Sequence, residues 1–367
     1  MDGRCAIVGG GLAGFVAYVT LRHRGIAPGE ITVFDTDPDP VAAWRPRAEA
    51  IRQTRMRSES DGHCYPRSFP GLAPREALRR RSLAPLVQTV CNRYRPTVRE
   101  FLQHVEELRD RSGWDESFSR HRVARARAAE RGFEIDDEGT FRHVLVAPGH
   151  AGLSVPGELA DDPRTVHAYE PHDYADRVAV VGAGMAAATE WLNALAAGAE
   201  VVSVRRRDPA RRPLNVPRPL FSKAGLAAFQ ASENEDRVAL LARLGEPSYP
   251  PGREWDEPLE RARHEGRFRV AGSVDGEAQV ICATGFRRGF AHDPLLRGLV
   301  AEHGLETEGR WIVLACDGTI PALTDDARTI ALAGAPAQWA YPAADTLVGM
   351  KYIARRFLQR VKACRTP

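Results

Sequence analysis

Residues 8–14 read Val-Gly-Gly-Gly-Leu-Ala-Gly and directly follow an apolar run. A continuous apolar run is typical of a parallel strand that is buried on both faces. A glycine-rich turn after such a strand, with a helix over about 12–23, is the arrangement that places a dinucleotide pyrophosphate at a helix N-terminus. Gly9 permits the sharp turn, Gly11 lets the backbone approach the pyrophosphate, and Gly14 lets the helix pack closely on the sheet.

The next apolar run, 31–34, ends at Asp35, which lies 21 residues after Gly14. A spacing of about 20 residues is expected for the acidic side chain that holds a ribose hydroxyl. Strand, turn, helix, strand and acid therefore occur in the order of an ADP-binding unit, and the alternative is a turn with a purely structural role. The residues of this unit that we assign to the nucleotide are Gly9, Gly11, Leu12, Ala13, Gly14 and Asp35.

The same pattern returns at residues 181–187, which read Val-Gly-Ala-Gly-Met-Ala-Ala. Ala187 takes the third glycine position, which governs only the packing of helix on strand. The following strand, 200–204, ends in three arginines and no acid, and such cations suit the extra phosphate of NADP. The alternative is a solvated arginine run in an arginine-rich chain. The residues assigned to this second nucleotide are Gly182, Gly184, Met185, Arg205 and Arg206.

Two such units in one chain indicate that two dinucleotides meet, which is how a nicotinamide reduces a flavin. We therefore predict a flavoprotein oxidoreductase with FAD on the first unit and NADPH on the second. Apolar strands that close on small-residue turns, 141–149 and 278–286, flank the second unit. They predict an α/β fold of two Rossmann-like dinucleotide-binding domains, in which an NAD(P)-binding domain is inserted into the FAD-binding domain. The predicted ranges are 1–154 and 286–367 for FAD and 155–285 for NAD(P).

Composition narrows the function classes. The 367 residues suffice for two cores, and a net charge of +3 is too small to indicate a nucleic-acid partner. No apolar run approaches the roughly 20 residues of a membrane helix. The first strand begins almost at Met1, so we expect no signal peptide and a cytoplasmic location. The sequence leaves the oligomeric state open.

Six cysteines show no CxxC spacing, which argues against flavoenzymes that use a paired redox disulfide. Cys5 and Cys282 fall on predicted core strands, where we expect them to be inert. The pair His63-Cys64 has no further ligands at a supporting spacing, so no metal site is predicted.

Between and after the nucleotide units, the sequence predicts helices over 75–94 and 97–112 and short strands over 119–125, 132–135 and 329–334. A last helix begins near Asp345 and Thr346, with Asp345 as its N-cap. If the start of this helix faces the flavin, its dipole stabilises negative charge on the reduced ring. The residues assigned to FAD in this part of the chain are Gly334, Asp345 and Thr346.

Together these landmarks resemble the two-dinucleotide-binding-domain flavoproteins. Within that group, the chain is similar to class B flavin monooxygenases, including the branch that hydroxylates amine nitrogens. Trp44, which we assign to the cofactor site, the stretch 55–58 with His63, and His167 before the second glycine turn carry this likeness. The resemblance implies that NADPH reduces FAD and that O2 forms a C4a-hydroperoxyflavin. A nucleophilic nitrogen or sulfur of a small, biosynthetic substrate then takes the oxygen.

Candidate substrate contacts lie in the loop after the FAD ribose strand and in the loop before the last helix. They are Arg55, Arg57, His63, Tyr65, Trp339 and Tyr341, and for each the alternative is plain packing or a solvated charge. No catalytic side chain is assigned, because the flavin carries the chemistry. Two other functions stay open: a reductase that passes electrons to a protein or quinone, and a non-redox flavoprotein.

Overall fold

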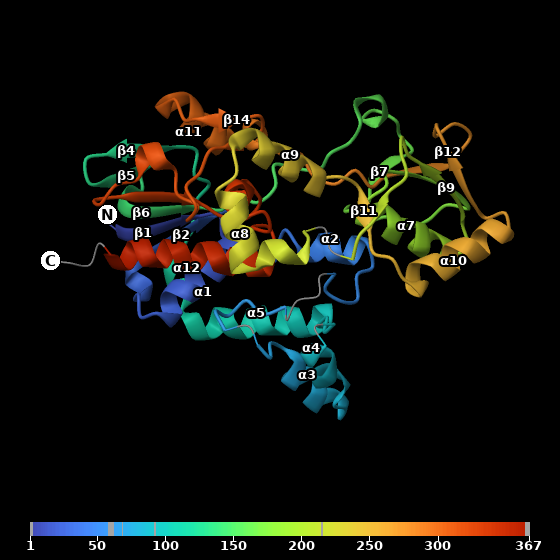
Figure 1. Ribbon diagram of the computed structural model, residues 1–367, viewed down its shortest axis with the longest axis horizontal. Coiled ribbons are helices and arrows are strands. Elements are labelled where there is room, and N and C mark those ends of the chain that lie inside the picture. Colours follow the sequence, from blue (N-terminus) through green and yellow to red (C-terminus); the bar gives the residue numbers. More distant parts are fainter. Residues whose placement is uncertain (1–2, 58–61, 68, 92, 214–215, 364–367) are drawn as a thin grey trace.

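Two mostly parallel sheets, each covered by helices, form the frame of the molecule (Figure 1). The computed structural model describes residues 3–57, 62–67, 69–91, 93–213 and 216–363. Among these residues, no helix combines the length and the apolar character that crossing a bilayer requires.

The first sheet is built around its central strand β1, which pairs in parallel with β2 on one side and β6 on the other. Strand β16 also pairs in parallel with β6, and β4 and β5 extend the sheet as an antiparallel edge. Its strands are β1 (Gly3–Val8), β2 (Ile31–Asp35), β3 (Phe118–Arg120), β4 (Ala126–Ala129), β5 (Gly132–Ile135), β6 (Gly139–Val146) and β16 (Thr329–Leu332). Ligands of such sheets bind outside the carboxyl ends of the strands where the strand order reverses, here between β1 and β6.

The second sheet is parallel throughout, in the order β12-β9-β8-β13-β7. Its strands are β7 (Thr165–His167), β8 (Arg177–Val181), β9 (Glu200–Val204), β12 (Phe268–Ala271) and β13 (Gln279–Cys282). The middle strand β8 is buried from Val178 to Val180, and α7 packs against it.

Helices cover both sheets. On the first sheet, α1 (Leu12–His23) packs against α12 (Leu347–Ala363), and α5 (Val98–Ser112) packs on α1. On the second sheet, α7 (Met185–Ala196) contacts α10 (Arg253–His264). The shorter elements include α2 (Arg45–Ala50), α6 (Trp114–Ser117), α11 (Pro294–His303), β10 (Ala210–Arg211), β11 (Ser248–Tyr249), β14 (Thr307–Glu308), β15 (Trp311–Ile312) and the 3-10 turn η6 (Ala335–Trp339).

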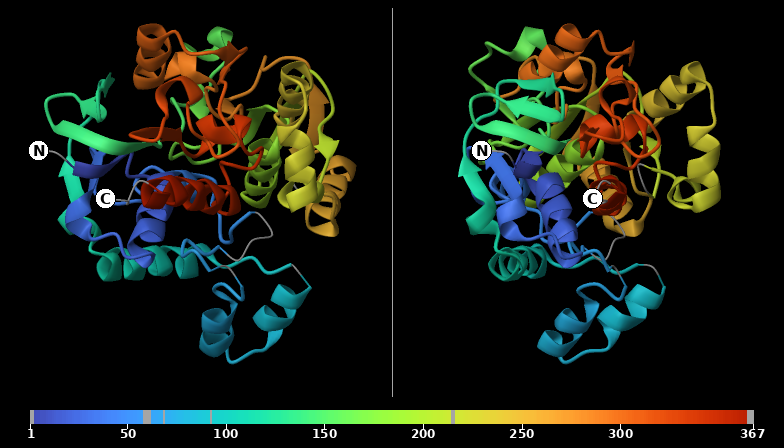
Figure 2. Two further views of the ribbon diagram at one scale, coloured as in Figure 1. Left: turned by 60° about the vertical axis from the view of Figure 1, so that its left-hand side comes forward. Right: turned by 90° about the vertical axis from the view of Figure 1, so that its left-hand side faces the viewer.

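Two helices cross from the second sheet to the first. Helices α8 (Lys223–Gln230) and α9 (Asn234–Leu244) lie in sequence between strands of the second sheet (Figure 2). Their apolar side chains Leu226, Phe229 and Leu241 nevertheless belong to the core of the first sheet. Packing therefore joins α8 and α9 to the first core although they fall inside the range 155–285. The domain boundaries given above stay a prediction.

Local structure differs from the sequence-based expectation in three places. The helix expected over 75–94 is two helices, α3 (Ala73–Arg80) and α4 (Ala84–Val90), because Arg81 adopts a left-handed conformation with φ 48° and ends the first. Thr346 rather than Asp345 caps α12, since its Oγ1 accepts the N–H of Gly349 at 3.2 Å. The strand expected over 119–125 is the short β3. The helix over 97–112 and the strand over 132–135 are confirmed.

Candidate functional site

The first glycine turn contains two glycines that the protein itself requires. Gly9 has φ +101°, and a Cβ there would lie 2.1 Å from the carbonyl oxygen of Ala147. A Cβ on Gly14 would lie 2.0 Å from the carbonyl oxygen of Gly9. No side chain fits at either position, so these glycines serve the turn and the close packing of α1 on β1.

Gly11 in the same turn differs, because nothing in the protein requires a glycine there. Its φ of −64° is open to any residue, and a Cβ would meet no atom within 4 Å. Gly11 is the N-cap of α1 and offers no side-chain cap to the first N–H groups of the helix. An open backbone at a helix N-terminus fits a dinucleotide pyrophosphate, whose oxygens accept those N–H groups.

The second glycine turn also contains one glycine that the packing requires and one that it does not. Gly182 has φ +131°, and its Cβ would lie 2.6 Å from the carbonyl oxygen of Ala283. Gly184 has φ −88° at the N-cap of α7, and a Cβ there would again meet nothing within 4 Å. Met185 is the first residue of α7. Both sheets therefore present an open cradle at the carboxyl end of their central strand.

Three further residues that the sequence assigns to the first nucleotide lie around the first glycine turn. Asp35, at the end of β2, accepts the N–H of Gly10 at 2.5 Å, which holds its carboxylate beside the first turn. Gly334, after β16, has φ +71°, and its Cβ would lie 3.4 Å from Cβ of Ala13, so this glycine sits over the first turn of α1. Leu12, the first residue of α1, is partly buried against the same core.

A cleft of about 780 Å³ lies beside the second cradle, where β8 and β9 end. Arg205 and Arg206 line it together with Gly182. The side chain of Arg205 is 11% exposed, pairs with Asp208 at 2.8 Å and lies over the ring of Trp191 at 5.6 Å. Its Nε is buried and has no hydrogen-bond partner among the described residues. Arg206 is 96% exposed, so Arg205 is the better positioned of the two for a ligand phosphate.

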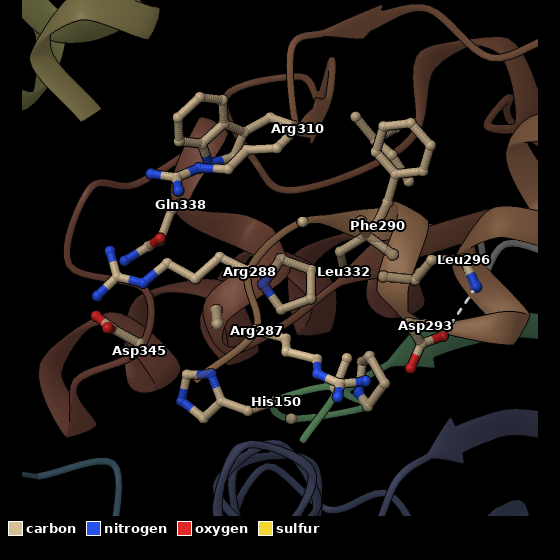
Figure 3. A pocket seen from close by; sticks show the side chains of 18 residues that line it. His150, Arg287, Arg288, Phe290, Asp293, Leu296, Arg310, Leu332, Gln338 and Asp345 are labelled. Carbon is tan, nitrogen blue, oxygen red and sulfur yellow. Dashed lines mark hydrogen bonds between the residues drawn. The ribbon is translucent and has the colours of Figure 1, made fainter. Parts of the chain in front are cut away.

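A second pocket opens at the carboxyl ends of β6 and β16, below η6 (Figure 3). Its polar side chains are those of His150, Arg287, Arg288, Asp293, Arg310, Gln338 and Asp345. Of these, only Asp345 was assigned from the sequence. Arg288 follows the small-residue turn 283–285 almost directly, which is a usable signal, but arginine clusters carry little weight in so arginine-rich a chain.

Three stacked aromatic rings lie near this pocket, in the segments that follow β6, β7 and β13. The ring of Phe286 lies between those of His150 and Tyr169, at centroid distances of 4.1 and 5.0 Å and interplanar angles of 9° and 11°. The guanidinium of Arg47, on α2, lies 4.9 Å from the Phe286 centroid. Burial, with the charges of Arg47 and Arg288, lowers the pKa of His150 to about 4, so this imidazole is neutral at physiological pH.

Three aromatic candidates from the sequence lie in packed positions. Trp44 precedes α2 and meets the ring of Phe101 edge-on at 5.2 Å. Trp339 is fully buried under the guanidinium of Arg237, which lies 4.9 Å from its ring. Tyr341 is buried and stacks on a neighbouring tyrosine of α12 at 4.7 Å. The structure shows packing contacts for all three, and their contacts with cofactor or substrate stay a prediction.

The remaining substrate candidates from the sequence, Tyr65, His63 and Arg57, do not line the pocket of Figure 3. Tyr65 bonds through its hydroxyl to His23, the last residue of α1, about 18 Å along that helix from Gly11. His63, Tyr65 and His23 line one cleft at this end of α1. Arg57 donates to Gln53 at 3.2 Å, and burial lowers its pKa. Ser58, which belongs to the same sequence stretch, lies outside the described residues.

Arg55 joins a buried carboxylate that holds the α3–α4 hairpin. Glu76 is fully buried and accepts hydrogen bonds from Tyr94 at 2.9 Å, Arg80 at 3.0 Å and Arg55 at 3.1 Å. Burial alone would raise the pKa of Glu76, but the hydrogen bonds from Tyr94 and Arg55 and the charge of Arg55 outweigh it and lower the pKa. The structure therefore gives Arg55 a partner within the protein.

Replacing Glu76 with glutamine is expected to lower the free energy of unfolding by about 2 kcal/mol, because three donors lose a charged acceptor. The folded-state pKa is lowered, so this stabilisation is present above the ordinary pKa of 4.5 and is lost as the pH falls through the lowered value. Urea unfolding of both proteins at neutral and acid pH, with proteolysis of the hairpin as a local probe, tests this. Glu106→Gln, on the exposed face of α5, is the matched control, and equal stability of the two variants at neutral pH would contradict the prediction.

The sequence profile of the pyridine nucleotide-disulphide oxidoreductase family matches residues 3–218, more than half of the chain. The chain belongs to this family. It is therefore an oxidoreductase of a family that works with FAD and NAD(P)H, and the predicted α/β class with two Rossmann-like dinucleotide-binding domains is confirmed. A comparison with curated proteins returned no match.

Solved structures of several enzymes share the family fold with this chain. An ornithine N-hydroxylase from Kutzneria sp. 744, solved with reduced FAD, NADP+ and L-ornithine, superposes with a TM-score of 0.74 at 17% identity, covering 99% of each chain. Ornithine hydroxylase PvdA from Pseudomonas aeruginosa gives 0.68 at 17% identity, covering 98% of this chain and 100% of that one. Bacillithiol disulfide reductase Bdr from Bacillus cereus gives 0.61 at 16% identity, covering 100% of both. At these identities the likeness establishes the fold alone.

Cysteine chemistry distinguishes activities within the family. Five cysteines lie among the described residues, and none of the five forms a disulfide. Cys5 and Cys282 are fully buried as expected, and burial raises the pKa of Cys282 to about 11. None of the described residues that line the pocket of Figure 3 is a cysteine.

Proposed function

We propose that this chain is an NADPH-dependent FAD monooxygenase that oxygenates a nucleophilic nitrogen or sulfur of a small substrate. One observation carries the proposal. The packing of the protein does not require a glycine at position 11 or at position 184, and the space beside each of these residues is open. A glycine with ordinary φ and empty space at its Cβ position is explained by a ligand that approaches the backbone. Two such sites, one on each sheet, support two dinucleotides in one protein.

Each cradle has residues suited to its own nucleotide. The N–H groups at the start of α1, with the Asp35 carboxylate, suit the pyrophosphate and ribose of FAD. The N-terminus of α7 with the guanidinium of Arg205 suits the pyrophosphate and the extra phosphate of NADPH. The chemistry that bound FAD supplies is hydride acceptance from NADPH and the activation of O2.

Oxygenation rather than disulfide reduction is favoured by the pocket at the ends of β6 and β16. Its arginine, histidine, amide and carboxylate side chains stand among apolar ones such as Phe290, Ile312 and Leu332, and none of the described residues that line it is a cysteine. The walls orient a small polar molecule, and the neutral His150 ring adds no charge to that wall near pH 7. The fold shared with ornithine N-hydroxylases supports the same assignment.

Rapid mixing tests this function. The FAD-loaded protein is reduced with NADPH without air and then mixed with oxygenated buffer while the flavin spectrum is followed. A monooxygenase is expected to lose the reduced-flavin spectrum first and to regain the oxidised band only after a delay. The same experiment after reduction with NADH is the control, because it shows whether the delay depends on which nucleotide stays bound to the protein.

Return of the oxidised band in one phase, with NADPH and with candidate amines and thioethers added, would contradict the proposal and favour a reductase. Absence of any reduction by NADPH in a flavin-loaded protein would favour a non-redox flavoprotein.

A further inference from the structure

Two arginine side chains share one wall of the pocket in Figure 3. Nη1 of Arg288 lies 2.7 Å, and Nη2 of Arg310 lies 3.5 Å, from the position that a Cβ on Gly245 would take. Both guanidinium groups thus lie near Gly245 at the end of α9, a residue that borders an open hollow next to the pocket rather than the pocket itself. Within the part of the chain that the structure describes, neither side chain has an ion pair or a hydrogen bond.

The surroundings of the two groups differ: Arg310 lies against an aromatic ring, whereas Arg288 lies near the carboxylate of Asp345, with which it interacts electrostatically without forming an ion pair. The guanidinium of Arg310 lies 4.5 Å from the ring centroid of Trp311, and burial with the charge of Arg288 lowers its pKa. Figure 3 shows the Arg288 head group between Gln338 and Asp345. Asp293, the other carboxylate of the pocket wall, is engaged at the N-cap of α11, where it accepts the N–H of Leu296 at 2.9 Å.

Asp345 interacts with Arg288 but forms no ion pair with either arginine, so the two like charges still repel one another, and an oxyanion placed between them reduces this cost. A guanidinium offers paired N–H donors that match the oxygens of a carboxylate or a phosphate. We propose that Arg288 and Arg310 form an oxyanion-binding subsite that holds an anionic group of the substrate. The identity of the ligand as substrate rests on the function proposed above.

Position distinguishes this subsite from the phosphate sites of the nucleotides. Neither Gly11 nor Gly184 nor Arg205 lines the pocket, whereas Leu332 and Gln338 do. Arg288 and Arg310 also border a second, open hollow together with Ser154 and His292. This hollow shares Ser154 with the cleft of Arg205, but Gly11, Gly184 and Arg205 do not line it.

The test measures anion binding by calorimetry on the oxidised, FAD-loaded protein without NADPH or turnover. The probes are inorganic phosphate and succinate, which separate a phosphate-bearing from a carboxylate-bearing ligand. Arg288→Gln and Arg310→Gln are each expected to weaken the preferred probe about ten- to hundredfold. Arg297→Gln is the matched control, because Arg297 lies exposed on α11 and does not line the pocket; its affinity should equal that of the wild type.

Unchanged affinity in both pocket variants, or no binding of either probe to the wild type, would overturn the subsite. A rise of the KM for NADPH in the pocket variants, with probe binding intact, would assign the arginines to the nucleotide and overturn it too. Arg288→Lys and Arg310→Lys, which keep the charge, serve if a glutamine variant loses flavin, and a partial loss of affinity is then expected. Because binding is measured without oxygen chemistry, failure of the rapid-mixing test leaves the anion result standing, and the reverse also holds.

Discussion

Replacing Gly11 with aspartate is expected to give a folded protein that contains almost no FAD. A Cβ at this position would meet no protein atom within 4 Å, so we expect the fold to tolerate the new side chain. The aspartate would fill the approach to the helix N-terminus and place a negative charge where the pyrophosphate must lie. Loss of several charge-assisted hydrogen bonds of about 1.5–3 kcal/mol each corresponds to a thousandfold or greater loss of affinity.

Flavin absorbance of the purified variant, normalised to protein, measures this effect, and thermal unfolding of the flavin-free proteins checks the fold. Gly298→Asp is the matched control, since Gly298 lies exposed on α11 and its Cβ would also meet nothing within 4 Å. The control should keep its flavin. A yellow, flavin-loaded Gly11→Asp protein would contradict the assignment of FAD to the first glycine turn.

Replacing Arg205 and Arg206 with alanine is expected to raise the KM for NADPH about ten- to hundredfold and to change the KM for NADH little. The guanidinium of Arg205 is held at the cleft by Asp208 and by the ring of Trp191, so little of its freedom is lost when a phosphate binds. Most of the effect should come from Arg205, because Arg206 is exposed and its nearest carboxylate lies 4.0 Å away.

Steady-state or anaerobic reduction rates with both nucleotides measure the change. Arg261→Ala, on the exposed face of α10 and outside the cleft, controls for a general loss of positive charge. An equal rise of the KM for NADPH and for NADH would contradict the prediction that Arg205 binds the extra phosphate of NADPH. It would favour the reading of this arginine run as a solvated surface.

The nucleotide-binding turns were predictable because their residues are close in sequence. Strand, glycine turn and helix form one continuous segment, so local conformation and spacing suffice to place Gly9, Gly14 and Asp35. The cap of α12 shows the limit of such reasoning. Asp345 and Thr346 are adjacent residues with similar capping ability, and one residue of register decides which side chain meets Gly349.

The substrate candidates were less predictable, because loop residues acquire their neighbours from distant parts of the chain. Trp339 and Tyr341 stand in a loop before a helix, yet the structure packs them into the core. Arg55 pairs with Glu76 on a helix that the sequence did not place beside it. Tertiary contacts of this kind have no periodic signature in the sequence.

By itself the sequence determined two dinucleotide folds and the residues of each glycine turn, since these depend on backbone conformation within short segments. Only the tertiary structure decided which glycines the protein requires and which it leaves open. It also brought Arg288, Arg310 and Asp345 to one pocket from three separate segments. The physical reason is that a pocket forms where the carboxyl ends of distant strands meet, and that meeting is set by sheet order and packing rather than by neighbours in the chain.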